Sequence, residues 1–302
     1  MTLDTEAALR RVREAPADAP SLADDDLLRA MLREDAAHGD LTTQALGLAS
    51  RGCLITFSAR RAMVVAGVEE AARLLALCAV RAVVLRPSGT HLQPGDAMLV
   101  GLGRAAGVFA AWKTAQTLAE ALSGIATVVA RIAAAAEGTG RRVPVACTRK
   151  NFPGTRTFSA RAVTAGGGIL HRLGTSETLL VFPQHLALVP DAERAALLSS
   201  LRRAQPEKRV VVEGCSREDA LVWARLGAEI LQLERFPPQE VRALRGALDA
   251  ARLDVKLAPA GGIDANNAAD YARAGADLLV TSAPYFAPPA DVVVTIEPVP
   301  EA

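Results

Sequence analysis

Apolar residues first recur at helical spacing in "LADDDLLRAMLRED" (residues 22–35), where acidic residues occupy the first turn. This pattern predicts a helix with Ser21 as its N-cap. Residues 1–20 contain no apolar segment of the kind found in signal peptides, and we interpret them as a mobile extension.

The next part of the chain mixes strand and helix patterns. Between Leu54 and about Gly103, strand-like apolar runs flank one helical pattern, "GVEEAARLLALCA" (residues 67–79). The sequence "QPGD" (residues 93–96) has proline and glycine at turn positions and is expected to join two strands. Residues 21–112 are therefore predicted to form an N-terminal α/β domain with a small sheet.

A different pattern follows in the second part of the chain. An alanine-rich helix, interrupted at Ser123-Gly124, runs to about Glu137, and six apolar runs then alternate with segments long enough for helices. This alternation is typical of parallel βα units, which form either a barrel or an open sheet. The predicted extent of this domain is residues 113–285. The last apolar run, "DVVVTIEP", is one more strand, and residues 286–302 are expected to return to the first domain.

Composition narrows the class of protein. The chain of 302 residues is 50% hydrophobic but only 4% aromatic, and its formal net charge is +1. Nucleic-acid-binding domains usually carry a basic excess, so this balance argues against one. No apolar run reaches the roughly 18 residues of a membrane span, and the scattered cysteines form no C-x-x-C pair. We therefore expect a soluble cytoplasmic protein with buried thiols.

One stretch of the chain concentrates positive charge. No Asp or Glu lies between Glu137 and Glu177, and the centre of this stretch, "CTRKNFPGTR" (residues 147–156), follows a short strand candidate. Because the whole chain is nearly neutral, this concentration predicts a bound anion. The cations of the stretch are Arg141, Arg142, Arg149, Lys150, Arg156, Arg161 and Arg172.

Polar and small residues follow the strand candidates, at the end where βα barrels build their sites. Early strands supply cations, middle strands supply carboxylates, and late strands supply small residues whose backbone N–H groups can hold a phosphate. This set suits a phosphorylated substrate with Mg²⁺. Taken singly, each residue has an ordinary structural explanation as a turn or a solvated charge. The residues chosen by position are Thr148, Arg149, Lys150, His185, Glu213, Glu234, Gly261, Gly262 and Ser282.

Longer motifs occur in order between about Ser21 and Thr295. They are "EDAAHGDLTT", "LSGIAT", "TRKNFPGTR", "GGGILHRLG", "VVEG", "LQLER", "APAGGI" and "GADLLVTSA". Together they resemble the nicotinate-nucleotide pyrophosphorylase family, also called quinolinate phosphoribosyltransferases. The resemblance implies an N-terminal α/β domain followed by an incomplete α/β barrel. It also implies a homodimer in which the partner subunit completes each active site.

The resemblance further implies an activity and a set of site residues. Members of the family transfer ribose 5-phosphate from phosphoribosyl pyrophosphate to quinolinate with Mg²⁺, and release pyrophosphate and CO₂. Here the expected catalytic residues are Lys150, Glu213 and Glu234, and the two glutamates are also the expected metal ligands. Substrate binding is expected at Arg149, His171, Arg172, His185 and, from the partner subunit, Lys113. Phosphate binding is expected at Gly261, Gly262 and Ser282.

The chain departs from the family pattern where a second carboxylate would be held. The family shows Lys-Asp-Asn-His where this chain has Phe182-Pro183-Gln184-His185, and Lys113 replaces an arginine. The family's second acid, an Asp before Asn, is Glu234 before Arg235. Lysine cannot reproduce the two-pronged hold of arginine on a carboxylate. These departures argue against quinolinate as the acceptor, and they resemble the ModD branch, which is associated with molybdenum transport.

Two other functions stay open at this point. Lys150 lies after a strand candidate, and a desolvated lysine there could form a Schiff base with a carbonyl substrate, as in aldolases. The altered carboxylate-binding residues also suit a non-catalytic protein that binds a phosphorylated metabolite or an oxyanion and serves molybdate uptake.

Overall fold

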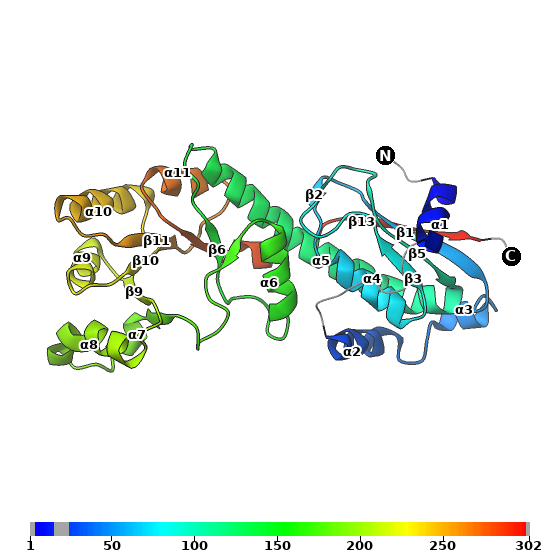
Figure 1. The fold of residues 1–302 in the computed structure, drawn as a ribbon, viewed down its shortest axis with the longest axis horizontal. Coiled ribbons are helices and arrows are strands. Elements are labelled where there is room, and N and C mark those ends of the chain that lie inside the picture. Colours follow the sequence, from blue (N-terminus) through cyan, green and yellow to red (C-terminus); the bar gives the residue numbers. More distant parts are fainter. Residues whose placement is uncertain (1–3, 15–23, 300–302) are drawn as a thin grey trace. The chain divides into compact units, whose positions relative to one another are not determined.

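The computed structural model describes residues 4–14 and 24–299, which form two compact units. Each unit is built on its own sheet (Figure 1). The predicted fold class is confirmed, because one sheet is small and antiparallel and the other is a curled parallel sheet. The N-terminal unit consists of the described residues within Met1–Thr127, Gly154–Gly166 and Phe286–Ala302. The barrel unit consists of Val128–Pro153 and Gly167–Tyr285.

An antiparallel sheet of 4 strands, in the order β13-β1-β5-β3, forms the centre of the N-terminal unit. Strand β13 comes from the end of the chain and pairs along its whole length with β1. The strands of this sheet are β1 (Gly52–Ala59), β3 (Arg81–Val84), β5 (Ala97–Arg104) and β13 (Val292–Pro298). The unit also contains the short strands β2 (Met63–Val64) and β4 (His91–Leu92). The helices are α1 (Thr5–Glu14), α2 (Asp25–Ala36), α3 (Leu41–Ala45), α4 (Val68–Leu77), α6 (Arg156–Ala165) and the first part of α5 (Ala105–Glu137).

The N-terminal segment is more regular than the sequence predicts. Residues Thr5–Glu14 of the predicted mobile extension form α1. Its Ala8 and Val12 are buried against Leu54 and Val100 of the sheet. Burial of this apolar stripe stabilises the helix, so the prediction of a mobile extension is wrong for these residues.

The next helix begins later than the sequence predicts. Helix α2 has Asp24 as its N-cap, and the Asp24 side chain accepts a hydrogen bond from the backbone N–H of Asp26 at 2.9 Å. The predicted cap, Ser21, lies outside the described residues. A carboxylate at the N-cap accepts a hydrogen bond from a free backbone N–H of the first turn, and it is as favourable there as the hydroxyl of a serine.

Helix α5 is continuous, so the predicted interruption at Ser123-Gly124 is wrong. Ser123 is buried and accepts a hydrogen bond from the backbone N–H of Ala66 at 2.9 Å. A Cβ atom at Gly124 would lie 2.4 Å from the carbonyl oxygen of Pro288. The glycine is therefore required by close packing of the chain against the helix.

Of the helices within residues 4–14 and 24–299, only α5 is long and apolar enough to cross a membrane. The mean hydropathy of its most apolar part is 1.5. However, buried residues recur on it every three or four positions, as on a helix that packs against a protein core. These residues are Ala111, Ala115, Ala119, Leu122 and Ala126, each at most 4% exposed.

The two units divide the chain differently from the predicted boundary at residue 112. The boundary falls at Thr127, inside α5, because one unbroken helix runs through the predicted position. Helix α6 lies within the predicted barrel domain, residues 113–285, but belongs to the N-terminal unit. There Arg161 forms an ion pair with Glu70, a carboxylate only 1% exposed, and a buried charge of this kind requires such a partner.

A sheet of 7 strands forms the barrel unit, in the order β7-β6-β12-β11-β10-β9-β8, with parallel neighbours. The terminal strands β7 and β8 do not pair with each other in the described chain, so the barrel is incomplete. The strands are β6 (Val145–Cys147), β7 (Ile169–Leu170), β8 (Leu179–Val181), β9 (Val210–Gly214), β10 (Ile230–Glu234), β11 (Lys256–Ala260) and β12 (Leu279–Thr281). The helices are α7 (Pro183–Leu186), α8 (Asp191–Ala204), α9 (Arg217–Arg225), α10 (Pro238–Ala250), α11 (Ala268–Arg273) and the short η1 (Ala283–Phe286).

The two faces of this sheet carry side chains of different size. On the outer face, bulky residues such as Leu231 and Leu257 pack with Trp223 of α9 and Leu244 of α10. Successive residues of a strand point to opposite faces, so the neighbours of these residues face the lumen. A separate cluster of small side chains lies there, namely Ala146, Ala258, Ala260 and Val280. Closed barrels usually fill the lumen with bulky branched residues, and these small ones leave space.

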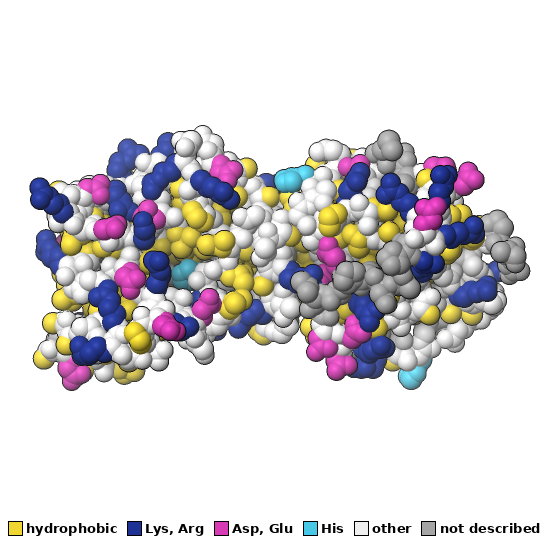
Figure 2. Space-filling view, in the orientation of Figure 1, with side chains coloured by type: hydrophobic (Ala, Val, Ile, Leu, Met, Phe, Trp, Pro, Cys, Tyr) yellow, Lys and Arg dark blue, Asp and Glu magenta, His cyan; other side chains and the backbone are white. Residues whose placement is uncertain are grey.

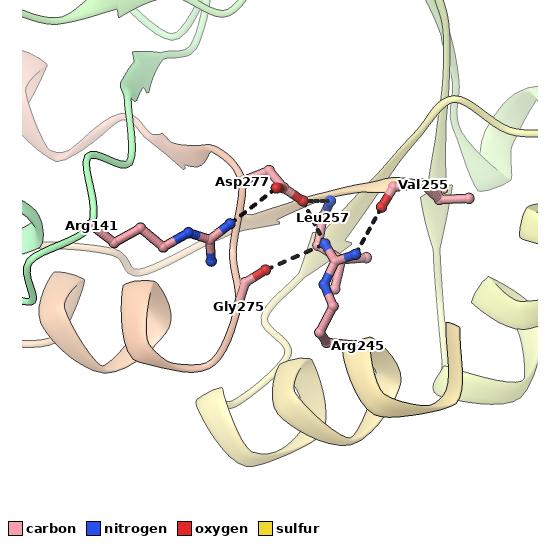
Figure 3. A network of polar contacts seen from close by, with 6 residues as sticks. All are labelled: Arg141, Arg245, Val255, Leu257, Gly275 and Asp277. Atoms are coloured by element: carbon pink, nitrogen blue, oxygen red, sulfur yellow. Dashed lines mark hydrogen bonds and ion pairs between the residues drawn. The ribbon is translucent and has the colours of Figure 1, made fainter. Parts of the chain in front are cut away.

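A polar network fastens the amino ends of β11 and β12 to α10 (Figure 3). The carboxylate of Asp277 accepts hydrogen bonds from the backbone N–H of Leu257 at 2.9 Å and from Arg245 Nη2 at 2.5 Å. Arg141 adds a third contact at 3.3 Å. Arg245 and Asp277 are 23% and 19% exposed, so the pair is largely shielded from solvent.

We expect Asp277→Ala to lower the free energy of unfolding by about 2–3 kcal/mol. It removes the acceptor of the Leu257 backbone N–H and the carboxylate partner of Arg245, a mostly buried guanidinium that keeps the carbonyl oxygens of Val255 and Gly275. Chemical denaturation measures the change. The matched control is Asp270→Ala, which removes the exposed pair with Arg273 and should cost less than about 0.5 kcal/mol. Equal losses in the two variants would contradict the role given to the network.

Candidate active site

A cavity of about 540 Å³ opens at the carboxyl ends of the barrel strands. In βα barrels this end carries the loops that build binding and catalytic sites. Predicted residues that are far apart in the sequence meet around it. Those lining the cavity are Thr148, Arg149, Lys150, His171, Arg172, Glu213, Glu234, Gly261 and Ser282.

One wall of the cavity is basic and follows β6 and β7. The backbone N–H of His171 donates to the carbonyl oxygen of Cys147 at 2.9 Å, which holds the two strand ends together. Arg149 and Arg172 extend from these ends. The Arg149 Nε is buried without a hydrogen-bond partner among the described residues. A buried donor of this kind needs an acceptor, and the anion predicted for this wall would supply one.

The acid-free stretch is not devoted to a single anion. Three of its cations have carboxylate partners away from the cavity: Arg141 pairs with Asp277, Arg142 with Glu137 and Arg161 with Glu70. On the face visible in Figure 2, Lys and Arg side chains (dark blue) are interspersed with Asp and Glu (magenta). The basic wall therefore depends on Arg149, Lys150 and Arg172 rather than on the whole stretch.

Burial and mutual repulsion set the protonation of the basic wall. Burial lowers the pKa of His171 from 6.5, the positive charge of Arg172 lowers it further, and Glu177 opposes both effects. Burial also lowers the pKa of Arg172, with a contribution from Arg149. His171 is therefore neutral at pH 7 and presents a hydrogen-bonding imidazole rather than a further cation.

The opposite wall is acidic and is built on β9 and β10. Burial raises the pKa of Glu213, the negative charge of Glu234 raises it further, and a hydrogen bond from Gln232 opposes the rise. That bond joins Gln232 Nε2 to Glu213 Oε2 at 2.7 Å. Two carboxylates thus face one cavity across from the cations. Such a site can bind a substrate that carries negative groups at one end and develops positive charge at the other.

Glycine is sterically required at one rim of the cavity. Gly261 has a φ of +84°, and a Cβ atom there would lie 2.7 Å from Glu234 Oε1. The following loop is fixed by Asn267, whose Nδ2 donates to the carbonyl oxygen of Gly262 at 2.9 Å. Thr281, which also lines the cavity, donates its hydroxyl to the carbonyl oxygen of Ile263 at 2.7 Å. This rim brings backbone close to any bound ligand.

Three predicted residues do not line the cavity. His185 Nδ1 accepts a hydrogen bond from the backbone N–H of Phe182 at 3.0 Å, so the imidazole caps the start of α7. Gly262 has a φ of +75° and lies next to the lining residue Gly261. Lys113 belongs to the N-terminal unit, where its Nζ lies 4.2 Å from the centre of the Trp112 ring. The expected contribution of Lys113 from a partner subunit stays a prediction.

The sequence prediction missed Gln232, which is 6% exposed and lines the cavity. It lies two residues before Glu234 on the same strand, and residues two apart share a face of a sheet. The polar residue at this spacing inside "ILQLE" could have identified Gln232 as a further lining residue from the sequence. Leu180, Gln184, Ala260, Val280 and Thr281 complete the lining beside Phe182.

The structure weakens the Schiff-base alternative. A lysine nucleophile is usually desolvated, but Lys150 is an exposed residue. The thiols take no part in the cavity: Cys147 is buried, which raises its pKa to about 12. Cys215 is exposed, contrary to the prediction that the thiols are buried.

A second cavity, of about 770 Å³, lies in the N-terminal unit. Its lining is mainly apolar, with Arg51 as its one charged residue among Leu48, Gly52, Cys53, Ala105, Phe109, Ile296, Pro298 and Val299. Functional sites combine an apolar lining with several convergent polar groups. The cavity in the barrel unit meets this description and the second one does not.

Comparisons with known proteins show which family the chain belongs to. The family model "Quinolinate phosphoribosyl transferase, N-terminal domain" matches residues 40–123, and the corresponding C-terminal domain matches residues 125–295. A ModD protein of Rhodobacter capsulatus, named as a candidate pyrophosphorylase, is 44% identical over 84% of this chain and 98% of its own length. A nicotinate-nucleotide pyrophosphorylase (carboxylating) of Mycobacterium leprae is 34% identical over 85% of this chain and 91% of its own.

Solved structures show the same architecture. NadC from Streptococcus pyogenes superimposes with a TM-score of 0.82 at 25% identity, covering 91% of this chain and 97% of that one. The nicotinate-nucleotide pyrophosphorylase of Francisella tularensis gives 0.81 at 22% identity, covering 93% and 100%.

We expect the imidazole of His171 to titrate below the pKa of 6.5 of free histidine, because burial and Arg172 disfavour the imidazolium. Arg172→Gln should raise the pKa by removing a like charge, whereas Glu177→Gln should lower it by removing an attraction. NMR titration of the histidine ring protons measures all three values. A wild-type value above 6.5, or shifts of the opposite sign, would show that the environment of the ring is misassigned.

Proposed function

Because the chain belongs to the quinolinate phosphoribosyl transferase family and is therefore a phosphoribosyltransferase, we propose that it transfers ribose 5-phosphate from phosphoribosyl pyrophosphate to an aromatic carboxylate, with release of pyrophosphate. The observation that supports this reaction is the opposition of charge within one cavity. Arg149, Lys150 and Arg172 lie on the basic wall, and Glu213 and Glu234 lie on the acidic wall.

Each wall has a separate task in the proposed reaction. The bond from the anomeric carbon to a pyrophosphate oxygen breaks as the carbon bonds to the acceptor, and positive charge grows on the ribose. Glu213 and Glu234 stabilise that charge, and carboxylates fixed before the reaction need no reorganisation. Arg149 and Arg172 bind the carboxylate of the acceptor and Lys150 the pyrophosphate, while the Gly261 rim binds the 5-phosphate.

The acidic wall also fits Mg²⁺. Within the described residues, no three His, Cys, Asp or Glu side chains converge into a complete metal cage. Mg²⁺ usually takes only one or two carboxylates and completes its coordination with water and substrate phosphates. Glu213 and Glu234 would hold Mg²⁺, which would supply positive charge beside the departing pyrophosphate.

The acceptor proposed here is not quinolinate. The wall that would hold a second carboxylate is formed by Phe182, and the Arg172 guanidinium carbon lies 5.7 Å from the centre of its ring. An aromatic ring can stack on the acceptor but cannot neutralise a carboxylate. We propose an acceptor with one carboxylate.

The cellular setting is proposed on the same basis. We propose a cytoplasmic homodimer in which Lys113 of each subunit reaches the cavity of the other, as the resemblance implies. From the resemblance to the ModD branch we also propose a link between this reaction and molybdenum transport. Incubation with phosphoribosyl pyrophosphate, Mg²⁺ and a panel of ring carboxylates tests the activity. Tight binding without pyrophosphate from any acceptor would favour the non-catalytic alternative instead.

We expect Glu213→Gln to lower kcat by at least about a hundredfold, because it removes one of the two charges that stabilise the ribose in the transition state. Thermal unfolding should change little, since the amide is nearly isosteric with the carboxylate. The matched control is Glu240→Gln, whose carboxylate pairs with Arg217 outside the cavity. A Glu213→Gln enzyme as fast as this control would remove Glu213 from the mechanism.

We expect Phe182→Lys to raise kcat/KM for quinolinate about tenfold or more relative to nicotinate. A new charge-assisted hydrogen bond to the second carboxylate contributes about 1.5–3 kcal/mol. Pyrophosphate release measures the ratio. Phe182→Met, which is neutral and flexible, is the control for a change of shape alone. The same ratio in both variants would show that residue 182 does not face the second carboxylate.

A further inference from the structure

Gln232 occupies a position inside the barrel where a polar side chain needs an explanation. It lies in the middle of β10, opposite Glu213 of β9 and Ala258 of β11. It is 6% exposed, whereas Glu234, two residues later on the same face, is an exposed residue. Gln232 therefore lies at the inner end of the cavity and Glu234 at its mouth.

The orientation of the Gln232 amide follows from its neighbour. An ionised carboxylate only accepts hydrogen bonds, so the contact of 2.7 Å with Glu213 Oε2 must be made by Gln232 Nε2. The amide oxygen, Oε1, then points away from Glu213. It is buried and has no hydrogen-bond partner in the described part of the chain.

The surroundings of this oxygen cannot satisfy it. The lumen cluster consists of Ala146, Ala258, Ala260 and Val280, with Ile230 and Leu278 packed against it, and none of these side chains has a donor. Buried carbonyl oxygens without partners are rare and unfavourable in native proteins. The small side chains leave space at the same place. An orphan acceptor beside an open lumen indicates a ligand that brings its own donor.

We propose that Gln232 is a specificity-determining residue whose Oε1 accepts a hydrogen bond from an amino, hydroxyl or ring N–H group on the acceptor. The substrate class is thus an aromatic acid with one carboxylate and one hydrogen-bond donor. This proposal rests on the proposed function, because it assigns the inner end of the cavity to the acceptor. The ribose is assigned to the mouth of the cavity, where Glu234 can accept hydrogen bonds from its hydroxyls.

The same arrangement rejects a second acid. A carboxylate at the inner end would face the Gln232 carbonyl oxygen and the carboxylate of Glu213, which are both acceptors. Lys150 is the cation that acts on Glu213 in this cavity, and the apolar side chains of the lumen cluster add no positive charge. A polar site built for a donor discriminates strongly against a ligand that lacks one, since its own polar group is then left unpaired.

Calorimetry on the full-length protein tests the proposal without relying on turnover. Nicotinate and its amino and hydroxy derivatives at each ring position are titrated into the wild type without phosphoribosyl pyrophosphate, so that binding is measured and no transfer can occur. We expect at least one derivative to bind about tenfold or more tightly than nicotinate. In Gln232→Met, which keeps the side-chain length, the advantage should fall to within about threefold. Gln232→Leu repeats the measurement in a second apolar variant.

The control variant is Gln239→Met, on the exposed part of α10, which should keep the wild-type preference. The proposal is wrong if no derivative outbinds nicotinate in the wild type, or if the preference survives in Gln232→Met. It is also wrong if Gln232→Met loses affinity for phosphoribosyl pyrophosphate instead, because the oxygen then serves the ribose. Discrimination without pyrophosphate release would overturn the proposed reaction and leave the assignment of Gln232 standing.

Discussion

The small side chains on the inner face of the barrel sheet are the constraint on which the site depends. Ala146, Ala258 and Ala260 occupy positions where a closed barrel would carry bulky branched residues. Stability must then come from the outer face, where residues such as Leu231 and Leu257 pack against the helices. This division lets the lumen stay open at the carboxyl end of the strands without weakening the core. Larger residues at the alanine positions would fill the space that a ligand needs.

Charge is used in two ways in the barrel unit. At the amino ends of the strands, Asp277 and Arg245 neutralise each other and fasten strands to a helix. At the carboxyl ends, cations and carboxylates line opposite walls, and the Arg149 Nε is left without a partner among the described residues. The first arrangement stabilises the fold. The second arrangement leaves charged groups without partners until a ligand binds. Functional sites commonly keep such groups at a cost to the stability of the fold.

The sequence predicted the parts of the site that depend on local order along the chain. Arg149 and Glu213 could be found because each lies at the end of an apolar strand, and parallel strands bring such ends to one edge. Contacts between distant segments could not be found this way. Gly124 was interpreted as a helix break because the approach of Pro288 is invisible in the sequence. Arg161 was counted with the anion site because its partner, Glu70, lies in another segment.

The proposed class of acceptor rests on the charges that the inner surface of the cavity can neutralise. Phe182 contacts Arg172 through its ring and adds no charge, whereas the family pattern has a lysine at this position. Deeper in the barrel, Gln232 offers a carbonyl oxygen beside Glu213. The second carboxylate of a dicarboxylate would lack a charge-assisted bond of about 1.5–3 kcal/mol beside Phe182, or would meet repulsion if it lay beside Gln232. A ring with one carboxylate and one donor leaves neither the basic wall nor the Gln232 oxygen unsatisfied, so Phe182 and Gln232 favour the same kind of acceptor in the proposed reaction.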